Sequence, residues 1–156
     1  MKIVLVLLAA AGVVFAGNPE QDFDTLLDAV YSADAESFQN CISTESNGLI
    51  GMMLMMIKLQ PEDAVAQISS ELGVEITTEQ LSAWNSTDFI ETILTSPAFA
   101  AELPPRQNVV VSGFETQGDS TKVFFNVTDL PQPFELLLVK EDGTWKLDQS
   151  VIQAEF

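Results

Sequence analysis

Four methionines within five residues are the feature of this sequence best suited to binding. Met52, Met53, Met55 and Met56 are all the methionines of the chain apart from Met1. Residues three or four apart are neighbours on a helix, so several of these thioethers would lie side by side. Clustered thioethers select copper(I), but they also fill irregular cores or form adaptable partner surfaces. Core packing is the interpretation that the sequence favours, with a binding surface and a copper site as alternatives.

The sequence gives little support for the common catalytic sites, because the chain has no histidine. This excludes Ser-His-Asp and Cys-His nucleophiles and zinc sites built on imidazole. The single cysteine, Cys41, lies on the apolar face of an expected helix and is best interpreted as a small buried hydrophobe. Tyr31 and Asp28 are three apart on one expected helix, a spacing open to acid–base chemistry. A half-buried tyrosine beside a solvated acid is the simpler interpretation, so we expect no catalytic residue and no cofactor.

The first sixteen residues have the pattern of a secretory signal peptide. A positive start at Met1-Lys2 precedes an apolar run over residues 3–14, and Val14-Phe15-Ala16 is a small-x-small cleavage site. We expect cleavage after Ala16, with an uncleaved anchor as the alternative. The mature chain, residues 17–156, would be a single domain, secreted or periplasmic, with no stable membrane insertion.

The charge of the chain limits its partners. The net charge is −17, and removal of residues 1–16 takes away one of the six basic residues and none of the 23 acidic ones, which leaves −18. Such a surface repels nucleic acid and anionic lipid, and it suits basic partners or simply solubility. We expect a small apolar ligand or a protein partner, and no nucleic acid. Glycosylation at Asn85 or Asn126, each in an Asn-x-Ser/Thr pattern, is left open.

Residues 18–103 have the caps and the periodicity of short helices. The expected helix signals are Asn18-Pro19, Asp34, Pro61 with Gly73 as the end, Thr77 with Gln80, Asn85 to Asp88 before a helix at 89–94, and Pro97. Two acid pairs, Asp22 with Asp24 and Glu62 with Asp63, lie at helix starts, where the helix dipole explains them.

Residues 43–59, between the helix signals at Asp34 and Pro61, are expected to form a polar loop followed by a buried helix. Residues 43–48 are the loop. Residues 49–59 are apolar nearly all round, and as a helix they span only about 16 Å of the ~30 Å needed to cross a bilayer. A helix that is apolar on every side is expected to be buried in the protein core.

The sheet part is predicted over residues 107–152. Four antiparallel strands are expected at 108–115, 121–128, 134–140 and 144–148, with a continuation of the last toward Ile152. Asp142-Gly143 between two apolar runs is a strong hairpin signal, because both residues accept positive φ. The expected buried face consists of Val123, Phe125, Val127, Phe134, Leu136, Leu138, Trp145 and Leu147. The fold class is therefore α+β, with N-terminal helices packed on a curved C-terminal sheet.

Two stretches resemble the nuclear transport factor 2-like superfamily. Residues 26–38 resemble its opening helices, with Ala33 where glycine is usual in a Gly-Asp-Ala-like step. Residues 141–148 resemble its last hairpin, where a tryptophan–lysine pair follows an acidic-glycine turn. Small exported bacterial members of unknown function are the most similar. The resemblance implies a curved antiparallel sheet wrapped around helices, with a pocket in the cone.

The inner face of this sheet is the candidate ligand pocket. Its apolar residues Phe125, Leu136, Leu138 and Trp145, together with Tyr31, suit an apolar ligand or simple packing. We therefore expect an exported, non-catalytic binding or accessory protein of unknown ligand. The alternatives are a small-molecule enzyme using the cone pocket and a copper(I) carrier using the methionine cluster.

Overall fold

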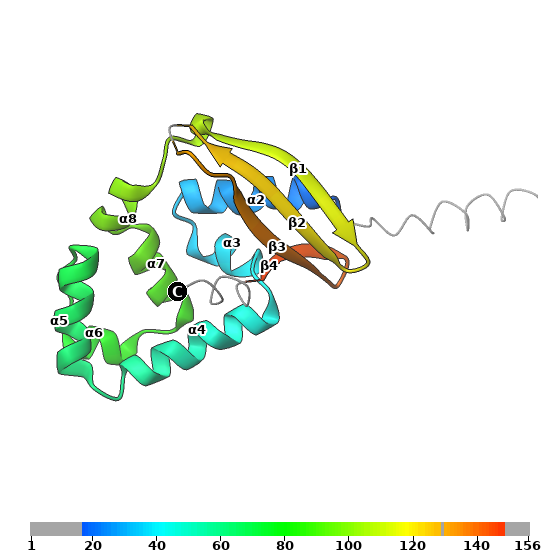
Figure 1. Cartoon of the computed structure of the whole chain (residues 1–156). Coiled ribbons are helices and arrows are strands. Elements are labelled where there is room, and N and C mark those ends of the chain that lie inside the picture. Colours follow the sequence, from blue (N-terminus) through cyan, green and yellow to red (C-terminus); the bar gives the residue numbers. More distant parts are fainter. Residues whose placement is uncertain (1–16, 129, 149–156) are drawn as a thin grey trace, which may run out of the picture.

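Figure 1 shows the chain as a computed structural model, which describes residues 17–128 and 130–148. The helices are Pro19–Tyr31 (α2), Ala35–Asn40 (α3), Thr44–Ile57 (α4), Pro61–Leu72 (α5), Thr78–Ala83 (α6), Ser86–Leu94 (α7), Pro97–Glu102 (α8) and the 3-10 turn Arg106–Asn108 (η1). The strands are Val109–Gln117 (β1), Ser120–Val127 (β2), Phe134–Glu141 (β3) and Thr144–Asp148 (β4). The predicted α+β class is confirmed, with helices packed on an antiparallel sheet. The expected signal peptide and the continuation of the last strand to residue 152 lie outside the described residues.

Local capping determines where most of the helices begin and end. The Asn18 side chain accepts a hydrogen bond from the first turn of α2, and Pro19 occupies its first position. Thr77 and Gln80 form the predicted capping box of α6. Gly73 ends α5 in the left-handed conformation, with φ of 68°. These predictions, made from single residues, are confirmed.

Two helix starts differ from the prediction. The polar loop expected over residues 43–48 is wrong, because α4 begins at Thr44 with Ser43 as its cap. Helix α7 begins at Ser86, three residues earlier than predicted, and Asn85 caps it. Both segments are rich in serine, threonine and asparagine, which favour breaks in the chain but also stabilise a helix start.

The four strands form a meander in which each strand pairs antiparallel with the next. The last hairpin turns at Asp142 and Gly143, whose φ angles are 52° and 85°, as the predicted tight turn requires. This turn places Lys140 opposite Trp145. An irregularity in the register between Val111 and Gly113 marks a bulge in β1.

Alternation along the strands buries one face of the sheet against the helices. Val123, Leu138 and Trp145 of the predicted face are buried. Phe125 and Leu136 are only half-buried, and 41% of Phe134 is exposed. It opens β3, and its ring stacks on that of its cross-strand partner Phe125 with 5.3 Å between centroids. The prediction of a buried Phe134 is therefore wrong, since alternation gives the side of the sheet but not how far the helices reach along it.

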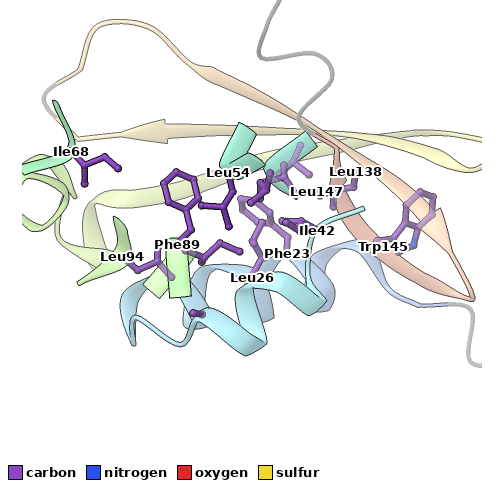
Figure 2. Packing of buried hydrophobic residues seen from close by; sticks show 14 of the residues in the cluster. Phe23, Leu26, Ile42, Leu54, Ile68, Phe89, Leu94, Leu138, Trp145 and Leu147 are labelled. Atoms are coloured by element: carbon purple, nitrogen blue, oxygen red, sulfur yellow. The ribbon is translucent and has the colours of Figure 1, made fainter. Parts of the chain in front are cut away.

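One hydrophobic core joins the sheet to the helices. Figure 2 shows its labelled side chains extending from Ile68 and Leu94 among the helices to Trp145 at the last hairpin. Helix α2 packs on β4, and α3 packs on both α2 and α7, so the core is continuous between the two parts. Within the described ranges, no helix is both long enough and apolar enough to cross a membrane.

Candidate functional site: a groove beside the methionine helix

Helix α4 is tied to the sheet at its N-terminus. The Glu141 carboxylate at the end of β3 accepts hydrogen bonds from the backbone N–H of Thr44, at 3.0 Å from each oxygen, and from its hydroxyl at 2.9 Å. A negative charge at this position is favoured by the helix dipole. The preceding residues add to the attachment, since Ser43 N–H donates to the Leu147 carbonyl of β4 at 2.9 Å.

The other end of α4 is tied to the helical part. Lys58 follows the last residue of the helix, and its ammonium group donates to the carbonyls of Ser82 at 3.0 Å and Trp84 at 2.6 Å. A cation beside a helix C-terminus is also favourable. Because α4 is held at both ends, its position relative to the sheet and to α6 is fixed by side chains distant in sequence.

Helix α4 buries only one side. Ser46, Ile50 and Leu54, each four residues apart, are its buried residues. We call the exposed apolar side the methionine face, which consists of Met52, Met53, Met55, Met56 and, just beyond the helix, Leu59. These five residues are exposed by 55%, 48%, 64%, 65% and 77%, respectively.

The prediction that residues 49–59 form a wholly buried helix is therefore wrong. The physical reason is that α4 packs on α7 and on β4 from a single side. Among the described residues that are large, apolar and exposed, five of the eight belong to the methionine face. Apolar residues gathered on one exposed helix face are characteristic of interaction sites.

Three adjoining hollows lie beside this helix, and together we call them the methionine groove. Their volumes are about 270, 360 and 360 Å³. Met53 lines all three hollows, while Phe89 and Ile93 of α7 line the first two. The apolar lining is completed by Phe38, Ile50, Met56, Ile57, Ala64, Ile68, Leu72, Ile90, Leu94 and Phe99. Residues of α4 and α5 form its sides and residues of α7 its floor, while Phe38 of α3 and Phe99 of α8 complete the first hollow. Figure 1 shows the positions of these helices.

Helix α5 gives the groove a polar and acidic rim. Asp63, Gln67 and Glu71 line it at successive spacings of four residues, so they follow one side of α5. The Gln67 amide donates to the Glu71 carboxylate at 2.8 Å. No basic residue lines any of the three hollows, and the nearby cation Lys58 donates its hydrogen bonds to backbone carbonyls instead. The charged residues of the rim are therefore all negative.

Two of the five residues predicted to line a cone pocket belong to the packed core. Leu138 and Trp145 are buried. The Trp145 indole N–H donates to the Gly17 carbonyl at 2.7 Å, and its backbone N–H donates to the Asp22 carboxylate at 2.8 Å. Asp22, assigned from sequence only to the helix dipole, thus also joins α2 to β4.

The other three residues of that predicted pocket also have protein neighbours. Phe125 lies between Phe23 and Phe134, with centroid distances of 6.1 and 5.3 Å. Leu136 is half-buried against the core. The Tyr31 hydroxyl donates to the Pro104 carbonyl at 2.6 Å, and burial raises the pKa of this phenol. The hollows of the methionine groove are lined by other residues, so a ligand pocket at these five stays a prediction.

Two further residues considered from the sequence are Asp24 and Cys41. Asp24 forms an ion pair with Arg106 at 3.1 Å, with both side chains largely solvated. Cys41 is half-buried, and burial raises the pKa of its thiol, which disfavours the reactive thiolate. The described part of the chain contains no group of three or more Cys, Asp and Glu side chains placed to hold a metal ion.

Sequence reasoning identified the methionines but not the groove beside them. The rim residues of α5 and the floor residues of α7 carry no motif, and their proximity to α4 depends on how the helices pack. The one available signal was the methionine run itself, because such runs occur in adaptable binding surfaces as well as in cores.

Comparison with known proteins gave no match of this chain to a family model, to a curated protein or to a solved structure.

Proposed function

We propose that this chain is an exported, non-catalytic binding protein whose binding site is the methionine groove. The observation that carries the proposal is the solvent exposure of four methionines of α4, two of which, Met53 and Met56, line the adjoining apolar hollows. An apolar face of this kind loses contact with water only when something covers it, which makes binding favourable. Methionine suits such a surface, since its flexible thioether adapts to the shape of its partner.

The rigid attachment of α4 supports the same proposal. Glu141 at one end and Lys58 at the other hold the helix in place, so little order has to be gained on binding. Buried Leu54 and Ile50 anchor its inner side. The exposed side is thus a preformed surface and not a segment that has to fold first.

The nuclear transport factor 2-like resemblance and the exported location belong to this proposal as its expected context. A four-stranded antiparallel sheet that ends in the Asp142-Gly143 hairpin, with helices packed on it, is compatible with the resemblance. The location rests on the pattern of residues 1–16. Mass spectrometry of the exported protein tests it: the expected N-terminus is Gly17, and an intact Met1 would contradict export by cleavage.

The binding site itself is tested with a neutral hydrophobic dye such as Nile red, because an anionic dye would be repelled by this chain. The wild-type mature protein should enhance the dye fluorescence, and the double substitution Met53→Gln with Met56→Gln should abolish most of that enhancement. The matched control is Val110→Gln with Leu130→Gln, which removes two apolar side chains of comparable exposure elsewhere. Equal loss in both variants, with both folded by circular dichroism, would refute the assignment of the site.

Copper(I) binding is a second candidate, and the exposure of the methionines favours it. Soft thioether ligands at helical neighbour spacing are able to reach a metal from solvent without unfolding α4. Folded protein that takes up one equivalent of copper(I) in competition with a chelator, and loses this ability on Met→Leu substitution, would support the carrier function. Since Met→Leu keeps the apolar surface, dye binding would survive the same substitutions if the first proposal holds.

A further inference from the structure

We infer that the partner of the methionine groove is a cationic amphipathic helix, a segment with one apolar face flanked by lysine or arginine. This inference rests on the proposed function and specifies the occupant of the same site. Its grounds are the shape of the groove, the sign of the charge on its rim, and the cost of placing any anionic occupant there.

The shape favours a helix that lies along the groove. The residues that line the hollows run from Ile50 to Ile57 on α4 and from Asp63 to Leu72 on α5, so the lined stretches are about 10 and 14 Å long. Met53 is common to all three hollows, and the neighbouring Ile57 is common to two of them. A row of adjoining apolar hollows matches the side chains that a helix presents at i, i+3, i+4 and i+7. A small round ligand would leave most of this length uncovered.

The rim supplies charge complementarity. Asp63 and Glu71 are eight residues apart on α5, which places them about 12 Å apart along the helix axis. Both are exposed, and the ion pairs of the described residues involve other acids, namely Asp24, Glu135 and Glu141. Basic side chains two turns apart on a bound helix would meet the two carboxylates, while the apolar face of that helix covers Met53 and Met56.

A second copy of this chain fits the groove poorly. Two mature copies would each carry a net charge of −18, and a two-fold interface would bring α5 rims of the same sign near each other. Anionic lipid surfaces are repelled for the same reason. A cationic helix is the occupant for which both the apolar floor and the acidic rim contribute favourably.

The test uses the mature chain and three synthetic helical peptides with one shared leucine face. Their polar faces consist of lysine, glutamine or glutamate, and binding is measured by isothermal titration calorimetry at physiological salt. The expected order of affinity is lysine, then glutamine, then glutamate. Binding of the lysine peptide should fall at least tenfold in the Met53→Gln, Met56→Gln variant.

A charge-matched pair of variants separates the rim from the general negative field. Asp63→Asn with Glu71→Gln removes two rim charges, whereas Glu115→Gln with Asp119→Asn removes two exposed acids of the β1–β2 hairpin, remote from α5 in Figure 1. Rim neutralisation should weaken the lysine peptide by about fivefold and leave the glutamine peptide unchanged. The hairpin variant should weaken the lysine peptide by less than about twofold.

Each other outcome overturns a defined part of the inference. Equal losses in the rim and hairpin variants would mean that the attraction is diffuse and that the rim does not select the partner. Equal affinity for the lysine and glutamine peptides would refute the cationic partner and leave the groove as a binding site. If no peptide responds to Met53→Gln, Met56→Gln, the proposed function fails as well. A concentration-dependent dimer in analytical ultracentrifugation, abolished by the same variant, would make a second copy the occupant.

Discussion

Replacement of Trp145 tests how the last hairpin holds the sheet to the first helix. This residue is 5% exposed, and its indole N–H donates to the Gly17 carbonyl at 2.7 Å. Trp145→Phe keeps most of the buried ring area and removes that hydrogen bond, which is expected to cost about 1 kcal/mol. Trp145→Ala also removes the ring and leaves a cavity, and it should cost roughly 3–5 kcal/mol.

The assay is equilibrium unfolding in urea followed by circular dichroism. The fluorescence of Trp84, the other of the two tryptophans, gives a second probe in both variants because it belongs to the helical part. Coincidence of the two probes would show that the sheet and the helices unfold together, as a shared core requires. Phe134→Ala, at a side chain that is 41% exposed, is the control and should cost clearly less than Trp145→Ala.

A loss below about 1 kcal/mol for Trp145→Ala would mean that the ring is not part of the core. The register that the Asp142-Gly143 turn imposes on β3 and β4 would then be incorrect, since a slip of one residue moves every side chain of β4 to the other face of the sheet.

Three further predictions concern single residues. Hydrogen bonds from the first turn of α3 lower the pKa of the Asp34 carboxyl below its ordinary 3.8. The stabilising contribution of this carboxylate is therefore present above pH 3.8 and is lost as the pH falls through the lowered pKa. Asp34→Asn should reduce the acid sensitivity of unfolding monitored by circular dichroism. Leu54→Ala should cost about 2–5 kcal/mol in urea unfolding and Met56→Ala less than about 1, because only Leu54 is buried, and equal costs would contradict the assignment of the faces of α4. Gly17→Ala should destabilise the protein by about 1–3 kcal/mol, because an added Cβ would lie 2.5 Å from the Gly143 carbonyl oxygen, and an unchanged unfolding midpoint would show that this contact is not maintained.

The sequence by itself determined the turns and helix ends that depend only on neighbouring residues. Asp142-Gly143 specifies its hairpin because both residues tolerate positive φ, and this holds wherever the hairpin is placed. The Thr77–Gln80 capping box and the Gly73 stop are equally local. Alternation in β2 likewise identified the buried side of the sheet through Val123. Each of these signals lies within a few residues of the structure that it specifies.

The tertiary structure alone decided which side of α4 faces solvent and what lies beside it. Its sequence is apolar on every side, so no periodicity marks the buried face. The face is chosen by contacts made across long separations, such as the bond from Thr44 to Glu141, 97 residues away, and the bonds from Lys58 to the end of α6. The acidic rim and the apolar floor come together for the same reason. Non-local packing determines which apolar residues remain uncovered, and those residues make the candidate binding site.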